Sequence, residues 1–203
     1  MTKLYLVRHG RTLWNDEMRY QGSSDIPLSK EGKNQARLLF ERFKNIHIDK
    51  IYSSPLSRSI QTVELISEYK NIKIKTDKRL QEIDFGEWEG KKESDLKRLY
   101  GKDYQNFCED PYKYKAPGER LIEDVQVRVV ECVDEIISKN AGKDILISSH
   151  GGSLRLLIMK YLKIEDARMF NRINMDNTSI SVLNIENGIV YLDKINDNLH
   201  LSF

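Results

Sequence analysis

Short runs with the pattern of strands alternate with amphipathic segments along most of the chain. The strand-like runs cover residues 4–7, 50–53, 72–75 and 144–149. Segments with apolar residues at helical spacing cover residues 36–43, 60–69, 119–140 and 154–161. Ser29 precedes the first of these helices and is expected to be its N-cap. This alternation predicts parallel strands joined by crossover helices.

The last part of the chain predicts a different unit. Residues 180–185 and 189–195 flank Asn187 and Gly188, which favours a β-hairpin with a two-residue turn. The polar segment 91–118 predicts short helices and loops that lie over the main body. No internal repeat or linker is evident, and 203 residues fit one domain. We therefore expect a single-domain α/β fold of three layers, with a mostly parallel central sheet flanked by helices.

The composition narrows the class of protein. Hydrophobic residues make up 39% and charged residues 32% of the chain, which is typical of a soluble globular protein. Lys and Arg total 33 against 31 Asp and Glu, without a long basic block, so nucleic acid is not the expected partner. No apolar stretch has the length of a membrane span, and residues 1–3 lead straight into a strand without room for a signal peptide. Two cysteines, Cys108 and Cys132, fit a reducing compartment, so we expect a cytoplasmic protein.

Two of the predicted strands end in the same dipeptide. His9-Gly10 follows the strand at 4–7, and His150-Gly151 follows the strand at 144–149. Ligands of an open α/β sheet bind outside the carboxyl ends of its strands. Parallel strands in one sheet would bring both imidazoles to the same edge, so we expect a site there.

Two arginines and a carboxylate add to this pair of histidines. Arg8 precedes His9, and Arg58 falls in the first turn of a predicted helix, where a cation is unfavourable unless an anion lies nearby. Guanidinium groups match phosphate oxygens in bidentate geometry. Glu82 lies in an acidic and aromatic loop and can deliver a proton to a leaving oxygen. Other acidic residues of this loop are Asp84, Glu87 and Glu89, of which we expect the last two to be solvated.

Four motifs together resemble one known family. Residues 6–12 read LVRHGRT, 53–62 read SSPLSRSIQT, 82–90 read EIDFGEWEG and 148–152 read SSHGG. In this order they resemble the histidine phosphatase superfamily, the phosphoglycerate mutase-like phosphatases, from residue 3 to about residue 195. The resemblance implies one histidine phosphatase domain over residues 1–203, in which residues 91–118 form a capping segment that sets specificity.

The same resemblance implies a phosphohistidine mechanism. His9 would attack phosphorus and carry the phosphoryl group. Arg8, Arg58 and His150 would hold the equatorial oxygens and neutralise their charge. Glu82 would protonate the departing alkoxide and then activate the water that hydrolyses phospho-His9.

The resemblance also implies a binding pocket. Asn15 would donate to a phosphate oxygen, and Gln21, Gly22 and the backbone of Gly151 would complete the pocket. No metal or other cofactor is implied, because the arginines supply the charge of a divalent cation. The implied partner is a small phosphorylated metabolite, and the resemblance is closest to α-ribazole-5′-phosphate phosphatases and broad-specificity phosphatases. Arg120 stands where that branch commonly has a serine, so no contact is carried over there.

Three other functions stay open at this point. A cofactor-primed phosphoglycerate mutase uses the same phosphohistidine, although the short chain and the loop at 82–86 resemble the phosphatases more. The second is a protein that binds a phosphorylated ligand without turnover. The third is a metal-dependent hydrolase built on His9, His150 and a carboxylate. The sequence does not predict the oligomeric state.

Overall fold

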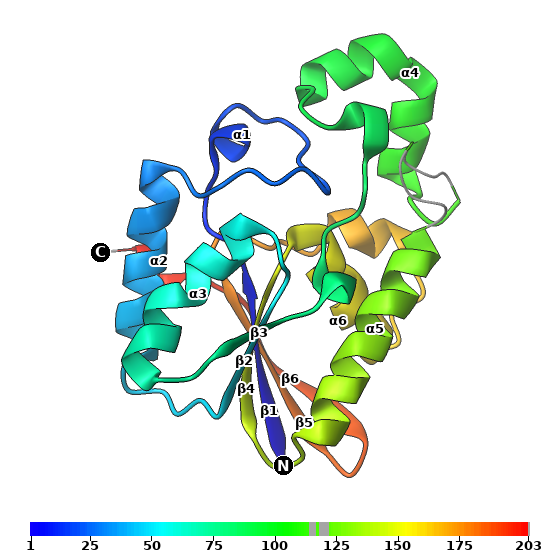
Figure 1. The fold of residues 1–203 in the computed structure, drawn as a ribbon. Helices are drawn as coiled ribbons and strands as arrows, with labels where there is room; N and C mark the ends of the chain where they lie inside the picture. The colour runs from blue at the N-terminus through cyan, green and yellow to red at the C-terminus, as the bar shows by residue number, and fades with distance from the viewer. Residues whose placement is uncertain (114–116, 118–121, 203) are drawn as a thin grey trace.

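Six strands form one sheet in the part of the chain that the structure describes, residues 1–113, 117 and 122–202 of a computed structural model (Figure 1). The strands are β1 (Thr2–Arg8), β2 (Lys50–Ser53), β3 (Ile74–Thr76), β4 (Asp144–Ser149), β5 (Ile180–Glu186) and β6 (Ile189–Asp197). Their order is β3-β2-β4-β1-β5-β6. β5 is antiparallel to both neighbours, and the other neighbouring pairs are parallel. The expected mostly parallel sheet is confirmed.

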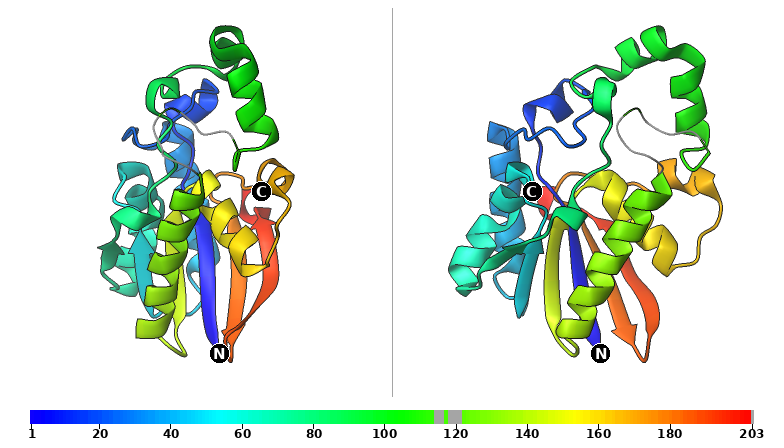
Figure 2. Two further views of the ribbon diagram at one scale, coloured as in Figure 1. Left: turned by 90° about the vertical axis from the view of Figure 1, so that its right-hand side faces the viewer. Right: turned by 45° about the vertical axis from the view of Figure 1, so that its right-hand side comes forward.

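Helices cover both faces of this sheet (Figures 1 and 2). The helices on one face are α2 (Lys30–Phe43) and α3 (Ser57–Lys70), and those on the other are α5 (Ile122–Lys139) and α6 (Gly151–Tyr161). Successive strand residues point to opposite faces. Leu4 and Leu6 therefore pack with α5 and α6, whereas Val7 packs with α2 and α3. The result is the expected three-layer α/β domain.

Local sequence signals explain where several elements begin and end. The Ser29 hydroxyl accepts a hydrogen bond from the backbone N–H of Gly32 at 3.1 Å, so Ser29 is the N-cap of α2 as predicted. Asn187 and Gly188 have φ angles of 52° and 78°. Two consecutive left-handed residues match the right-handed twist of a hairpin, and the predicted two-residue turn between β5 and β6 is confirmed.

Two details differ from the predicted elements. β3 begins at Ile74, two residues after the start of the predicted strand, because Asn71 takes a left-handed φ of 52° and ends α3 before the chain extends. Tyr69, the last position of the predicted apolar stripe of α3, is 61% exposed. Its ring packs edge-on against Phe40 at the surface, with 5.4 Å between the ring centroids.

Within the polar segment 91–118, the residues of α4 (Glu93–Glu109) lie over the carboxyl ends of the strands (Figure 1). α4 stands above the loops that follow β1 and β3, together with the short α1 (Leu13–Asp16) (Figures 1 and 2). α4 consists of two short helices that meet in a kink at Gly101, where φ is 44° and ψ is −111°, so the predicted short helices are confirmed here. The expected start of α5 at residue 119 lies outside the described residues. Arg120, which stands where the phosphatases that the sequence resembles commonly have a serine, lies outside them as well.

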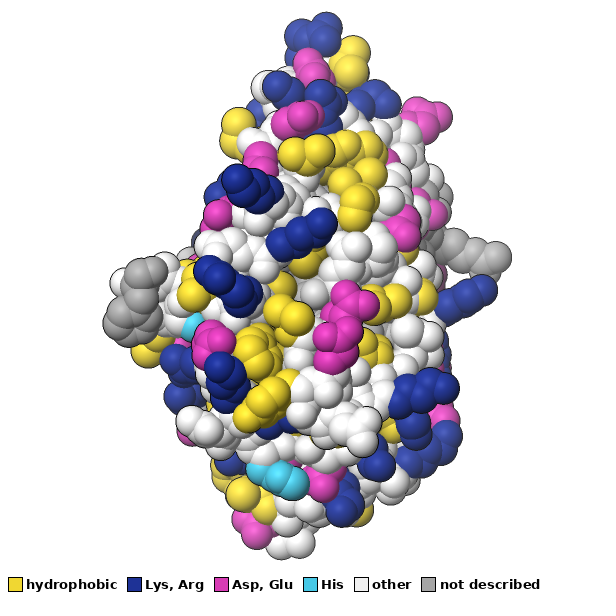
Figure 3. All heavy atoms as spheres, turned by 60° about the vertical axis from the view of Figure 1, so that its left-hand side comes forward, with side chains coloured by type: hydrophobic (Ala, Val, Ile, Leu, Met, Phe, Trp, Pro, Cys, Tyr) yellow, Lys and Arg dark blue, Asp and Glu magenta, His cyan; other side chains and the backbone are white. Residues whose placement is uncertain are grey.

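The surface carries both signs of charge. On the face shown in Figure 3, Lys and Arg side chains are interspersed with Asp and Glu side chains. Such intermixing agrees with the nearly balanced composition. No described helix is long and apolar enough to cross a membrane. Within the described ranges, no group of three or more His, Cys, Asp or Glu side chains could hold a metal ion.

Candidate active site

Parallel pairing of β1 with β4 brings the two His-Gly dipeptides together. Arg8 pairs with Ser149 in this register, and the backbone N–H of His9 donates to the carbonyl of Ser149 at 2.9 Å. The rings of His9 and His150 lie with centroids 5.1 Å apart. Their exposed fractions are 3% and 0%. The structure thus places both imidazoles at one edge of the sheet, in a site that is almost closed to solvent.

One hydrogen bond determines the tautomer of His9. Nδ1 lies 2.8 Å from the carbonyl oxygen of Gly10, which can only accept, so Nδ1 carries the proton. Nε2 is then left with a lone pair. Burial lowers the pKa of His9 well below its usual value, and the charges of Arg58 and Arg8 lower it further. His9 is therefore a neutral imidazole with a nucleophilic Nε2.

His150 is held on both of its ring nitrogens. Nε2 lies 2.8 Å from the hydroxyl of Ser54, and Nδ1 accepts from Nε of Arg58 at 3.3 Å. Burial, followed by the charge of Arg58, lowers the pKa of His150 well below its usual value. A contact between His150 and a phosphate oxygen requires one of these hydrogen bonds to exchange.

Arg58 connects this pair to the loop after β1. Its guanidinium donates to the carbonyls of Ser24 at 2.6 Å and Gly22 at 2.7 Å, in addition to His150. The side chain is fully buried, and burial lowers the pKa of Arg58 to about 10, so the group stays charged at neutral pH. The predicted first-turn position of Arg58 in α3 is confirmed.

Arg8 lies against the first turn of α6. Its Nη1 donates to the carbonyl of Met175, and its buried Nε has no hydrogen-bond partner among the described residues. A Cβ at Gly151 would lie 3.4 Å from that Nε. Burial and then the charge of Arg155 lower the pKa of Arg8 to about 10. Arg8 therefore has a charged donor available for an anion beside the helix N-terminus.

The Glu82 carboxylate caps α6. Oε2 accepts from the backbone N–H of Gly152 and Oε1 from that of Ser153, both at 3.0 Å. A Cβ at Gly152 would lie only 2.6 Å from Oε1, so glycine is needed for this approach. The carboxylate is thereby fixed at the helix N-terminus, on the same side as Arg8 and Gly151.

A cavity of about 200 Å³ opens beside these residues. It is lined by Arg8, Tyr20, Glu82, Ile83, Phe85, Phe107, Cys108, Gly151, Gly152, Arg155, Phe170 and Asn171. Phe107 and Cys108 belong to α4, so the polar segment contributes to the wall. His9, Arg58 and His150 do not line this cavity, whereas Arg8 and Gly151, the chain neighbours of His9 and His150, do.

Three predicted binding residues lie outside this wall. Asn15 uses its side-chain oxygen to accept from the Thr12 N–H at 3.1 Å within the capping box of α1. Gln21 is 8% exposed, and its side-chain oxygen has no hydrogen-bond partner among the described residues. Gly22 has a φ of 53° and contributes its carbonyl to Arg58. None of the three residues lines the cavity, and Gly22 is the one that contacts Arg58 directly among the described residues.

Comparison with known proteins assigns the family. The histidine phosphatase superfamily (branch 1) matches residues 4–198. The chain belongs to this superfamily. Phosphoserine phosphatase 1 of Hydrogenobacter thermophilus is 34% identical over 201 residues, which cover 99% of this chain and 95% of that protein. GpmB of an Enterobacter species, named as a probable phosphoglycerate mutase, is 34% identical over 184 residues, which cover 89% and 84%.

Solved structures of histidine phosphatases share the fold. YhfR of Bacillus stearothermophilus has a TM-score of 0.93 and 32% identity, covering 99% of this chain and all of that one. A phosphoserine phosphatase variant of Entamoeba histolytica in complex with phosphoserine has a TM-score of 0.87 and 30% identity, with the same coverage. An α-ribazole phosphatase of Shigella flexneri has a TM-score of 0.86 and 26% identity, covering 97% and 96%. The superfamily suggested by the four motifs is confirmed, and the protein is a phosphatase-type enzyme.

The expectation that the Glu89 side chain is solvated is wrong. Instead of being solvated, its carboxylate accepts from the backbone N–H groups of Ser23 at 2.8 Å, Ser24 at 2.9 Å and Phe85 at 3.1 Å. Both serine hydroxyls also donate to it. Because the carbonyls of Gly22 and Ser24 hold Arg58, Glu89 fixes the loop on which that arginine depends.

Arg155 was not predicted as a site residue. It lies in α6 and lines the cavity next to Arg8 and Glu82. The available signal was a cation between Leu154 and Leu156, two buried positions of a largely apolar helix. A charged residue in such a helix is buried only when it has a partner or a ligand.

Proposed function

We propose that this histidine phosphatase hydrolyses a small phosphorylated metabolite through a phosphohistidine formed on Nε2 of His9. The observation that carries the proposal is the state of His9, a neutral imidazole oriented by the Gly10 carbonyl and flanked by Arg8 and Arg58. A lone pair in that position can attack phosphorus, and two guanidinium groups can stabilise the charge that develops.

The reaction proceeds in two displacements. The Nε2 lone pair of His9 attacks phosphorus, the P–N bond forms, and the P–O bond to the alcohol breaks. Glu82 gives its proton to the departing alkoxide. Water then attacks phosphorus while Glu82 takes one of its protons, and the P–N bond breaks to release phosphate and neutral His9. General acid–base help of this kind contributes about 10²–10⁴-fold in rate.

Positive groups hold the phosphoryl oxygens during both steps. Arg8 and Arg58 supply guanidinium donors, and the first turn of α6 supplies the backbone N–H of Gly151. Buried donors that are already oriented cost little reorganisation in the transition state. Asn15, Gln21 and His150 provide the remaining contacts to the phosphate. His150 makes its contact after one of its present hydrogen bonds exchanges.

Replacement of His9 tests this mechanism. His9→Ala is expected to lower phosphate release by at least about 10³-fold, because the nucleophile is lost. His47→Ala is the control, since His47 is exposed and pairs with Asp49. Wild-type enzyme quenched during turnover should contain acid-labile phosphate that is missing from His9→Ala. Turnover in His9→Ala close to wild type would contradict the mechanism.

A phosphoglycerate mutase is the second candidate, because GpmB is among the relatives. It would use the same phosphohistidine and return the phosphoryl group to bound glycerate. Incubation of 3-phosphoglycerate with a bisphosphate primer separates the two reactions. We expect phosphate release to exceed isomerisation, and the opposite ratio would favour the mutase.

Several finer features belong to the same proposal. The segment 91–118 sets specificity, since α4 contributes Phe107 and Cys108 to the cavity wall. Catalysis is independent of metal ions, so activity should survive exhaustive chelation. Phosphoserine and α-ribazole 5′-phosphate are the first metabolites to test, because relatives carry both names. Free thiols at Cys108 and Cys132 fit the cytoplasm.

A further inference from the structure

The guanidinium group of Arg155 lines the cavity, and part of its hydrogen-bonding capacity is not used by the described residues. Its Nε donates to the carbonyl of Ile173 at 2.8 Å, and its guanidinium lies 5.6 Å from the ring centroid of Phe170. These contacts hold the plane of the group in place. Its two terminal nitrogens make no hydrogen bond or ion pair to any residue that the structure describes. An edge with two parallel donors is the geometry that binds a carboxylate or phosphate in bidentate fashion.

Binding of the phosphoryl group leaves the terminal donors of Arg155 free. In the proposed mechanism Arg8 and Arg58, which flank His9, hold the phosphoryl oxygens. Arg155 lines the cavity beside Arg8 and is influenced by the charges of Glu82 and Asp176, neither of which makes an ion pair with it among the described residues. The alcohol part of a substrate in this cavity therefore meets a guanidinium edge, and an anionic group there would satisfy its donors.

The size of the cavity limits the substrate. Its volume of about 200 Å³ is below the 300–1,000 Å³ that is usual for drug-sized ligands. Phe85, Phe107 and Phe170 form apolar parts of the wall. A leaving group of a few carbon atoms fits this space, with its anionic end beside Arg155.

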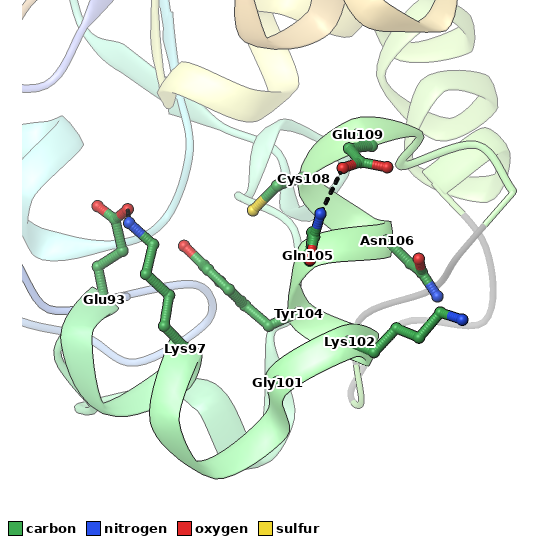
Figure 4. Close-up of a pocket in the computed structure, with 9 residues that line it drawn as sticks. All are labelled: Glu93, Lys97, Gly101, Lys102, Tyr104, Gln105, Asn106, Cys108 and Glu109. Atoms are coloured by element: carbon green, nitrogen blue, oxygen red, sulfur yellow. Dashed lines mark hydrogen bonds and ion pairs between the residues drawn. The ribbon is translucent and has the colours of Figure 1, made fainter.

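A larger groove on α4 has a different character. Its volume is about 780 Å³, and it meets the catalytic cavity at Cys108, which lines both (Figure 4). Lys97 in this groove pairs with Glu93 at 2.6 Å, and Gln105 donates to Glu109 at 2.8 Å. Lys102, the other cation of the groove, is exposed and is solvated by water, so no cation among the described residues of the groove is comparable to the largely buried Arg155.

We propose that Arg155 forms a second anion subsite, and that the preferred substrates are compact phosphomonoesters whose alcohol part carries a carboxylate. This inference rests on the proposed phosphatase function and specifies its substrate class. α-Ribazole 5′-phosphate has no carboxylate, so it is not a preferred substrate on this view.

Two pairs of substrates test the subsite directly. Phosphoethanolamine is phosphoserine without its carboxylate, and glycerol 3-phosphate has a hydroxymethyl group where 3-phosphoglycerate has a carboxylate. We expect wild-type enzyme to prefer the acid of each pair by about 10–100-fold in kcat/KM, the range for a charge-assisted bidentate contact. Arg155→Gln should remove most of this preference, and Arg155→Lys should restore part of it. Arg168→Gln is the control, since Arg168 is exposed and pairs with Asp166, and should keep the preference.

The outcomes separate this inference from the proposed mechanism. An equal loss on both members of each pair in Arg155→Gln, or no preference in wild-type enzyme, would overturn the subsite. If Arg155→Gln does not fold, the wild-type preference and the Arg155→Lys variant decide. Hydrolysis of p-nitrophenyl phosphate that depends on His9, without a preference for acids, contradicts the subsite alone. No His9-dependent hydrolysis of any of these esters contradicts the phosphatase mechanism itself.

Discussion

Arg58 keeps its orientation through the loop that follows β1 and through a carboxylate from outside that loop. The carbonyls of Gly22 and Ser24 hold its guanidinium, and the Glu89 carboxylate holds the loop that carries them. A Cβ at Gly22 would lie 2.1 Å from Oε1 of Glu89, so the loop and the carboxylate are in close contact. Glu89 is therefore a positioning residue for the arginine.

Glu89→Gln tests this role. The amide keeps one acceptor and replaces the other with a donor that faces backbone N–H groups, so we expect a loss of about 1–3 kcal/mol in the free energy of unfolding. At temperatures where the variant stays folded, kcat should fall at saturating substrate, because Arg58 is no longer held for the transition state. Steady-state kinetics and urea unfolding measure both effects. Glu87→Gln, at an exposed position of the same loop, is the matched control.

An unchanged kcat in a less stable Glu89→Gln would assign the residue to stability alone. The preference for acidic substrates should persist in this variant, because Arg155 does not depend on the loop. Measurement of kcat and of the preference for acidic substrates therefore distinguishes a displaced Arg58 from a lost anion subsite at Arg155.

A single site residue could be predicted from the sequence where residues next to it in the chain determine its position. His9 and His150 could be assigned to one edge of the sheet because each directly follows a strand. Glu89 and Arg155 were missed because their partners are distant in the chain: Glu89 binds Ser23 and Ser24, and Arg155 binds the carbonyl of Ile173. No period or motif in the sequence indicates such contacts.

The N-terminus of α6 positions both Glu82, the proposed general acid, and Arg8, a proposed phosphate ligand. Glu82 caps its first turn, and Arg8 lies against Gly151. The helix dipole and free N–H groups at this end favour negative charge, which serves the carboxylate and the phosphate alike.

Gly152→Ala tests the close approach of Glu82 to α6. The new methyl group would lie 2.6 Å from Oε1 of Glu82 and 2.7 Å from Cδ1 of Ile83, so the acid must move. We expect kcat/KM to fall by about 10²-fold or more, as for loss of a general acid, with overpacking that costs about 1–3 kcal/mol of stability. Gly151→Ala should be milder, because its nearest new contact is 3.4 Å. Equal activity of the two variants would argue against a close fit at Gly152.

Elements were predicted best where their pattern is complete within a few residues. The hairpin turn at Asn187 and Gly188 needs only its own backbone signals. Short helices were predicted for the polar segment 91–118, but the position of the kink at Gly101 was not, because the aromatic packing of Tyr104 and Phe107 against Trp88 holds the second short helix in place. Tertiary contacts therefore decided the form of the segment that covers the site.

Across the whole molecule, sheet order explains why distant motifs meet. β2, β4 and β1 are neighbours, so the residues that follow them converge at one edge. His9 and His150 are both buried and neutral there, which links the folding of the entire domain to pH. In the unfolded chain both imidazoles would have a pKa of about 6.5.

The free energy of unfolding should therefore fall as the pH drops below about 6.5. The folded pKa values of both histidines lie well below the unfolded value, so the unfolded chain binds protons first and gains stability from them. Stability from these two groups is fully present above pH 6.5 and is lost as the pH falls toward the folded values. The two imidazoles of the site give a loss of about 3 kcal/mol between pH 7.5 and 5.5. Burial also lowers the pKa of His200, which adds to this loss.

Urea unfolding at pH 7.5, 6.5 and 5.5 measures this loss. His150→Gln should reduce this loss by about 1.4 kcal/mol, the share of one imidazole, whatever its effect on stability at pH 7.5. His47→Gln should leave the dependence unchanged, since the side chain of His47 is 75% exposed. A free energy of unfolding that stays constant from pH 7.5 to 5.5 would mean that the pKa values of His9 and His150 are the same in the folded and the unfolded protein. His9 would then be mostly protonated at pH 5.5, and its Nε2 could not attack phosphorus at that pH.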